Sequence, residues 1–181
     1  MTAPVEGSPV KKRYWVVVDV EADGPIPPQY SMVCLGAVVV EPPPQRTFYC
    51  RTRPVSAIWQ PEALAISGFS RELHETFPEP RWEMERFERW LRNLGGRPIF
   101  VSDNVAFDWQ WVNWYLHNYT NGNPFGWSGR RIGDLWGGFK QDARASWKRL
   151  RKTRHDHNPV NDAMGNVEAL LEMAKHIKGI L

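Results

Sequence analysis

The stretch "VVVDVEADGP", residues Val16 to Pro25, decides the fold. Consecutive β-branched apolar residues predict a buried strand that carries two carboxylates, Asp19 and Glu21, before Gly24 and Pro25 end it. Residues two apart in a strand point to the same face, so these two carboxylates are neighbours. Such a pair repels itself unless a cation or water neutralises it. An isolated D-x-E pair is also common where a strand simply ends in solvent, so the rest of the chain must distinguish these interpretations.

The segments around this strand predict an α/β fold. Strands are expected over residues 14–20, 31–41 and 46–52, and their short links favour an antiparallel meander. Helical periodicity and stop signals then predict helices over 61–68, 80–96, 104–118 and 158–181, strands over 97–102 and 130–136, and a loop or helical segment over 137–157. We therefore expect a central mixed five-stranded sheet, its first three strands antiparallel, flanked by helices.

Length and composition are those of an ordinary globular protein. The 181 residues predict a single domain over 13–181, preceded by a polar, flexible arm over 1–12 that is neither a signal peptide nor a membrane segment. Cys34 and Cys50 lie in apolar runs, which favours buried reduced thiols and a cytoplasmic location. The net charge of +3 indicates only a mild preference for polyanions, and the ten tryptophans offer surfaces for packing, subunit contact or base stacking.

Two further acidic residues and a histidine could complete a site with Asp19 and Glu21. Asp108 follows Asn104 by one helical turn, and Asp162 lies in the first turn of the last helix, five residues after His157. Taken singly, each could be a helix-dipole partner, a cap or a surface group. Taken together, the four acids are the hard oxygen ligands that Mg²⁺ or Mn²⁺ prefers, and a neutral histidine can accept a proton from an attacking water. The set predicts a metal-dependent phosphodiester hydrolase with two ions in its site.

Three motifs resemble those of the DEDDh (DnaQ-like) 3′-to-5′ exonucleases, which have a ribonuclease H-like fold. They are "VVVDVEADGP", "DNVAFD" and "HNPVNDAMGNVEALL", and a softer block, "PEALAISGFSRELHETFPEP", resembles the segment that follows the third strand in this family. The likeness spans residues 14 to 175. In size the chain is similar to the small exoribonucleases, namely oligoribonuclease, ribonuclease T and the adenylate-preferring enzymes.

The resemblance implies a role for each matching position. Asp19, Glu21 and Asp162 would bind the metal ions, Asp108 would act partly through water, and His157 would be the general base. Contacts to the terminal nucleotide would come from Val20, Ala22, Phe69, Asn104 and Phe107, the first two through the backbone. A homodimer is also expected by analogy.

Several functions stay open at this point. The leading one is an exoribonuclease that releases nucleoside 5′-monophosphates from single-stranded or short RNA 3′ ends. The alternatives are a DNA 3′-to-5′ exonuclease of the proofreading type, since the 2′-hydroxyl contact that separates the two is not readable here, and an inactive nucleic-acid-binding module. His155 and His157 form an H-x-H pair of the kind that binds zinc elsewhere, although a zinc site needs further ligands. The basic run over 147–154 is either a solvated face or a source of phosphate contacts.

Overall fold

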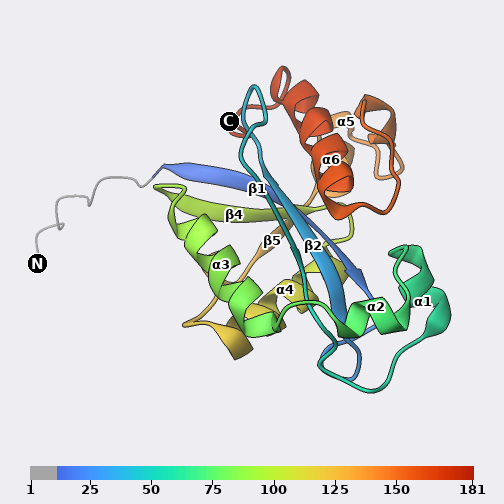
Figure 1. Cartoon of the computed structure of the whole chain (residues 1–181). Coiled ribbons are helices and arrows are strands. Elements are labelled where there is room, and N and C mark those ends of the chain that lie inside the picture. The colour runs from blue at the N-terminus through green and yellow to red at the C-terminus, as the bar shows by residue number, and fades with distance from the viewer. Residues whose placement is uncertain (1–11) are drawn as a thin grey trace, which may run out of the picture.

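A computed structural model describes residues 12–181, so the arm expected over 1–12 lies outside the described residues except for its last position. The described chain forms one sheet with helices on both faces (Figure 1). The strands are β1 (Arg13–Ala22), β2 (Met32–Val39), β3 (Thr47–Arg51), β4 (Arg97–Ser102) and β5 (Gly129–Arg131). The helices are α1 (Pro61–Ile66), α2 (Arg71–Glu75), α3 (Pro80–Arg92), α4 (Val105–Tyr119), α5 (Ile132–Lys140), the 3₁₀ turn η1 (Lys148–Leu150) and α6 (Pro159–Ala174).

The sheet has five strands in the order β3-β2-β1-β4-β5, which places β1 at its centre. β1 pairs antiparallel with β2 and parallel with β4, β2 pairs antiparallel with β3, and β4 pairs parallel with β5. This confirms the predicted mixed sheet with its first three strands antiparallel.

β1 is apolar at consecutive positions because both of its faces are covered. Val16, Val18 and Val20 belong to a core formed with α3 and α4. Trp15 and Val17 point to the opposite face and belong to a second core formed with α5 and α6. A strand enclosed in this way buries both sets of side chains, as expected for the middle of an α/β sheet.

The strand expected over 130–136 is wrong beyond its first two residues. β5 is a three-residue edge strand, and the chain enters α5 at Ile132. Ile132 and Trp136, one helical turn apart, are both buried in the core beneath α6, whereas Asp134, which a strand would place on the same face, is exposed. The sequence prediction also missed α2, a short helix whose N-cap residue Ser70 accepts a hydrogen bond from the amide of Leu73 at 3.2 Å.

Two smaller expectations concern thiols and membranes. Cys34 and Cys50 are buried and free, as predicted. In the part of the chain that the structure describes, no helix combines the length and the apolar character needed to cross a membrane.

Candidate active site

Asp19 and Glu21 lie at the carboxyl end of β1 and share the face of Val17, which α6 covers. In the β1–β2 ladder, Asp19 is opposite Gly36. The register shifts between Glu21 and Ala22, and such a bulge bends a strand and redirects its side chains. The two carboxylates therefore project from the last regular pairs of the central strand toward the start of α6.

Gly36 lets α6 approach the sheet closely. A Cβ atom at this position would overlap the backbone of Pro159, the first residue of the helix. Asp162, one turn further along α6, is only 1% exposed and faces the end of β1. Oxygens of Asp19, Glu21 and Asp162 consequently lie within 4.8 Å of one another. The structure thus brings together three of the four predicted carboxylates.

Asp108 reaches the same strand end from α4. The parallel pairing of β1 with β4 ends at Val17, which leaves the amide of Val20 outside that ladder. This amide donates to Asp108 Oδ1 at 3.1 Å, and the Asp108 side chain is almost fully buried. Asn104, at the N-cap position of α4, accepts the amide of Asp108 with its backbone carbonyl at 3.1 Å, which fixes the first turn of the helix.

Three of the carboxylates, Asp19, Glu21 and Asp108, are electrostatically unfavourable without a cation. Burial raises the pKa of Asp19 well above its usual range, and the charges of Asp108, Glu21 and Asp162 raise this pKa further. Burial, followed by the Asp162 charge, raises the pKa of Glu21 to about 7. Burial also raises the pKa of Asp108 to about 7, against the opposing effect of its hydrogen bonds. These carboxylates resist ionisation when no cation is bound. Their donor atoms are all oxygens, which fits a hard divalent cation whose charge offsets the repulsion.

Both histidines of the H-x-H pair lie at this site. His155 Nδ1 is 2.7 Å from Asp162 Oδ1, and the backbone amide of His157 donates to Asp162 Oδ2 at 3.1 Å. His157 has a left-handed backbone, with φ of 59°, and its Nδ1 lies 3.5 Å from Glu21 Oε1. The two rings are 4.4 Å apart, centroid to centroid. Donor atoms of His155, His157 and Asp162 also lie within 4.8 Å of one another, so Asp162 is shared between a carboxylate group and a histidine group.

Arg151 is a site residue that the sequence alone does not distinguish from the rest of its basic run. Its guanidinium donates to Asp162 Oδ1 at 3.0 Å, and its side chain is only 11% exposed. The guanidinium lies against Gly165, where a Cβ atom would collide with it. Glycine inside a helix costs about 1 kcal/mol relative to alanine. Gly165 in the apolar last helix was therefore the one sequence signal that another group packs closely against this helix.

A second group of residues missed from the sequence holds the loop that follows Glu21. Asp23 is fully buried and accepts the amide of Ser31 at 2.5 Å and the guanidinium of Arg71 at 3.0 Å. Burial raises the pKa of Asp23, while the Ser31 amide and Arg71 lower it. Because Arg71 begins α2, this ion pair attaches that helix to the end of β1.

Four of the predicted substrate contacts lie on β1 and α4. The side chains of Val20 and Ala22 are buried in the core, so only their backbone can face a ligand. Asn104 is exposed at the start of α4. Phe107 is half-buried and packs edge-on against Trp111, with ring centroids 6.1 Å apart.

The fifth predicted contact, Phe69, is half-buried between α1 and α2. Its ring meets Phe77 edge-on, with centroids 5.0 Å apart, and packs on the small core of Val33 and Leu64. It also lines a hollow of 250 Å³ together with Trp59. One part of the Phe69 ring is therefore packed in the core, and another part is exposed.

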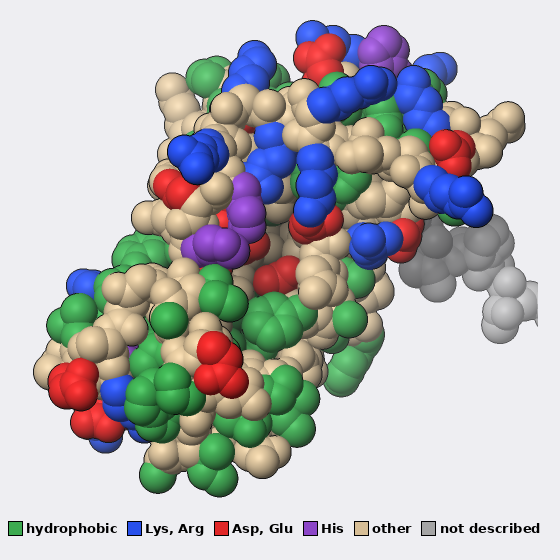
Figure 2. All heavy atoms as spheres, turned by 90° about the vertical axis from the view of Figure 1, so that its right-hand side faces the viewer, with side chains coloured by type: hydrophobic (Ala, Val, Ile, Leu, Met, Phe, Trp, Pro, Cys, Tyr) green, Lys and Arg blue, Asp and Glu red, His purple; other side chains and the backbone are tan. Residues whose placement is uncertain are grey.

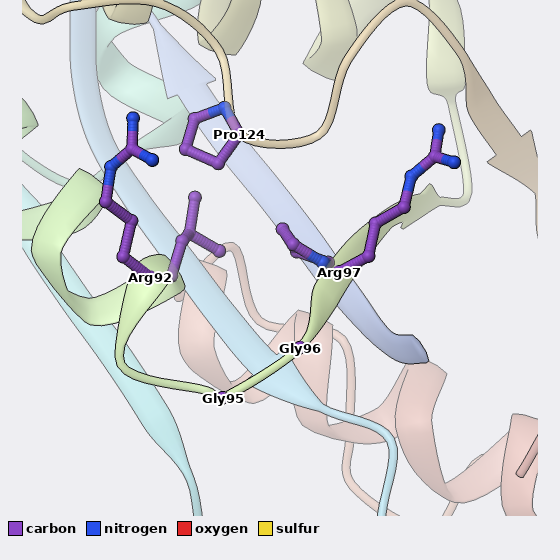
Figure 3. Close-up of a pocket in the computed structure, with 7 residues that line it drawn as sticks. Arg92, Gly95, Gly96, Arg97 and Pro124 are labelled. Carbon is purple, nitrogen blue, oxygen red and sulfur yellow. The ribbon is translucent and has the colours of Figure 1, made fainter. Parts of the chain in front are cut away.

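A recess with acidic side chains lies between two different surfaces of the molecule. Figure 2 shows acidic side chains at the bottom of the recess, histidines at its rim, Lys and Arg side chains above and hydrophobic side chains below. A larger hollow of 610 Å³ lies at the opposite end of the sheet, where α3 ends and β4 begins. Arg92 and Arg97 flank it, with Pro124 across from the Gly95–Gly96 turn (Figure 3). None of the four carboxylates lines this hollow.

Comparisons with known proteins agree with this geometry. No family model matches the chain. It is 34% identical over 171 residues to the 3′-5′ DNA exonuclease Cap18 of Escherichia coli, covering 87% of this chain and 89% of that protein. Among solved structures, E. coli ExoI in a zinc-bound complex with single-stranded DNA has a TM-score of 0.72 at 13% identity, covering 94% of this chain and 42% of ExoI. A 3′-exonuclease described as recognising the 3′ end of a histone mRNA stem-loop has a TM-score of 0.71 at 11% identity, covering 93% of this chain and 84% of that one. The chain therefore belongs to the DnaQ-like 3′-to-5′ exonucleases of the ribonuclease H-like superfamily.

Proposed function

We propose that this protein is a 3′-to-5′ exonuclease that removes nucleoside 5′-monophosphates from single-stranded DNA. The observation that carries the proposal is the convergence of Asp19, Glu21 and Asp162 within 4.8 Å, beside His157. We propose DNA rather than RNA as the preferred substrate because the relative that is 34% identical is a DNA exonuclease.

The same carboxylates are proposed to bind two Mg²⁺ or Mn²⁺ ions. Asp19, Glu21 and Asp162 offer clustered oxygens, and Asp108 is placed to act partly through water because its Oδ1 already accepts the Val20 amide. Bound ions of this kind supply charge for the oxygens that attack and leave a phosphodiester. The raised pKa of Glu21, about 7, and that of Asp108, about 7, mean that protons leave these groups when cations bind.

His157 is proposed as the general base. Glu21 lies 3.5 Å from its Nδ1 and favours the tautomer that carries the proton there, which leaves the lone pair of Nε2 to accept a proton from water. The resulting hydroxide attacks the last phosphodiester, the bond from phosphorus to the 3′ oxygen breaks, and that oxygen is protonated as it leaves. His157 is about half exposed at the rim, so solvent can exchange its proton after each cycle.

The terminal nucleotide is proposed to lie across the end of β1. The backbone of Val20 to Ala22 supplies the floor, and Asn104 offers an exposed amide at the start of α4. Phe69 and Phe107 are the proposed apolar contacts for the base and sugar, because both are only half-buried.

An exoribonuclease is the second candidate. It is supported by the resemblance to small exoribonucleases and by the fold likeness to an enzyme that recognises an mRNA 3′ end. Matched single strands of DNA and RNA, labelled at the 5′ end and digested with Mg²⁺, separate the two. We expect a higher kcat/KM on DNA, and a higher value on RNA would reverse the order of the candidates. An inactive binding module is disfavoured because all five expected catalytic positions are present.

A further inference from the structure

Two neighbouring hollows lie beside the carboxylate site. The first, of 350 Å³, is lined by residues 148 and 151–155 together with Asp103. The second, of 440 Å³, also contains Asp103 and Lys148 and continues toward α5. Because they share these two residues, we treat the hollows as one channel, the basic groove. Its basic residues are Arg131, Arg144, Lys148, Arg151, Lys152 and Arg154.

The groove begins at the active site. Arg151 and His155 line its first hollow, and both contact Asp162, at 3.0 and 2.7 Å. Asn104, one turn before Asp108, lines the second hollow. A strand whose 3′ end lies at the carboxylates would therefore enter this groove without leaving the surface.

The groove is strongly cationic. Six basic residues line it against a single acidic residue, Asp103. Lys148 pairs with Asp103 at 3.4 Å, and Arg131 pairs with Asp134 at 2.7 Å. Lys152 and Arg154 are exposed and form no ion pair within residues 12–181. Figure 2 shows the Lys and Arg side chains gathered on one side of the acidic recess.

The wall of the groove is held in place by hydrogen bonds to Glu168 and by the buried side chain of Trp147. Glu168 of α6 accepts the amides of Lys152 at 2.8 Å and Thr153 at 2.7 Å, as well as the Thr153 hydroxyl at 2.9 Å. Trp147, at the start of η1, is 3% exposed in the core beneath α6. The free cations at Lys152 and Arg154 thus stand on a backbone that is already ordered, which lowers the entropy cost of binding.

We propose that the basic groove binds the sugar-phosphate backbone of a single strand on the 5′ side of the scissile phosphodiester. The inference rests on the proposed function, because that function sets the 3′ end of the strand in the carboxylate recess. The groove offers guanidinium and ammonium groups, and its one aromatic residue, Trp147, is buried. Recognition is consequently of phosphates and independent of sequence.

The test compares two substrates of different length. A dinucleotide carries only the scissile phosphodiester, whereas a strand of about ten nucleotides also reaches the groove. In the double variant Lys152→Ala/Arg154→Ala, we expect unchanged turnover of the dinucleotide and a rise of about tenfold in KM for the longer strand. The slope of log affinity against log salt should flatten by roughly 1.4, at about 0.7 per lost phosphate contact.

The matched control removes two arginines from the far end of the sheet. Arg92→Ala/Arg97→Ala has the same change of charge at the hollow of Figure 3, and it should leave both substrates unaffected. An equal loss in both double variants, or wild-type KM on the longer strand for the groove variant, overturns the proposal. If the wild-type protein cleaves neither substrate, the proposed function fails. Fluorescence anisotropy of the longer strand with Ca²⁺ then still tests the groove. The proposal requires that the groove variant bind this strand more weakly than the wild type does, and that the control variant bind it as the wild type does.

Discussion

Asp19 lies directly opposite Gly36 in the β1–β2 ladder, and the first turn of α6 rests on that glycine. The contact fixes the distance between Asp19 on the strand and Asp162 on the helix. The geometry of the site therefore depends on a residue that has no side chain.

Replacing Gly36 tests this dependence. In Gly36→Ala the new methyl group meets the backbone of Pro159, so α6 must shift away from β2. We expect turnover to fall by more than about tenfold and the free energy of unfolding to fall by about 1–3 kcal/mol, the usual cost of overpacking. Nuclease assays and chemical denaturation measure the two effects. Gly138→Ala on α5 is the control, because nothing lies within 4 Å of its added Cβ, and full activity in Gly36→Ala would refute the account.

The raised pKa values predict how the stability of the metal-free protein depends on pH. The pKa of Glu21 and that of Asp108 are about 7 in the folded protein, against about 4 in an unfolded chain. Between these values the folded state retains protons that the unfolded chain has released, so the stabilisation is complete below pH 4 and is lost as the pH rises through 7.

The variant Glu21→Gln removes one of these groups. With EDTA at pH 8, we expect its free energy of unfolding to exceed that of the wild type by about 1–3 kcal/mol, at about 1.4 kcal/mol per pKa unit. The difference should disappear near pH 4, and Mg²⁺ should stabilise the wild type more than the variant. A difference in unfolding free energy between variant and wild type that stays constant across this pH range would contradict the raised pKa of Glu21.

Arg151 offers a separate test of the electrostatics. Its positive charge lowers the pKa of Asp19, so Arg151→Gln should raise that pKa further. Protons then compete better with cations, and the pH midpoint of Mg²⁺ binding should move upward by roughly one unit at most. Titration calorimetry at several pH values measures this shift. Arg151→Lys should restore most of the wild-type midpoint, and Arg149→Gln, on the exposed side of η1, should not change it. A downward shift in Arg151→Gln would overturn the assignment.

The two histidines should differ in their contribution to the rate. His157→Ala is expected to lower kcat by about 10²–10⁴-fold, because it removes the proposed base, with little effect on thermal unfolding. His155→Ala should have a smaller effect, since His155 contacts Asp162 through its Nδ1 but is not the proposed base. Parallel kcat measurements at neutral pH decide the matter. Near wild-type turnover in His157→Ala would show that the base has been misassigned.

The sequence predicted which acidic side chains meet at the end of β1, because strand and helix periods constrain where side chains point. Alternation along β1 placed Asp19 and Glu21 on one face, and the motif spacing added Asp108 and Asp162. The short links and apolar runs predicted the antiparallel pairing of the first three strands and a mixed sheet. They did not predict the order β3-β2-β1-β4-β5, which depends on contacts between distant segments.

What the sequence did not reveal depends on contacts between distant segments. Arg151 acquires its role only when η1 packs against α6, and Asp23 only when it meets Arg71 on α2. The edge strand β5 is three residues long, and the residues after it, which we expected to continue the strand to residue 136, belong to α5 instead. Such features need the tertiary structure.

Digestion of a 5′-labelled single strand of DNA with Mg²⁺, compared between the wild type and Asp19→Asn, tests the central claim most directly. The account predicts a ladder that shortens by one nucleotide at a time from the 3′ end, free nucleoside 5′-monophosphates, and no products from Asp19→Asn or with EDTA. Internal cuts, products that carry 3′ phosphates, or a ladder that persists in a folded Asp19→Asn variant would contradict it.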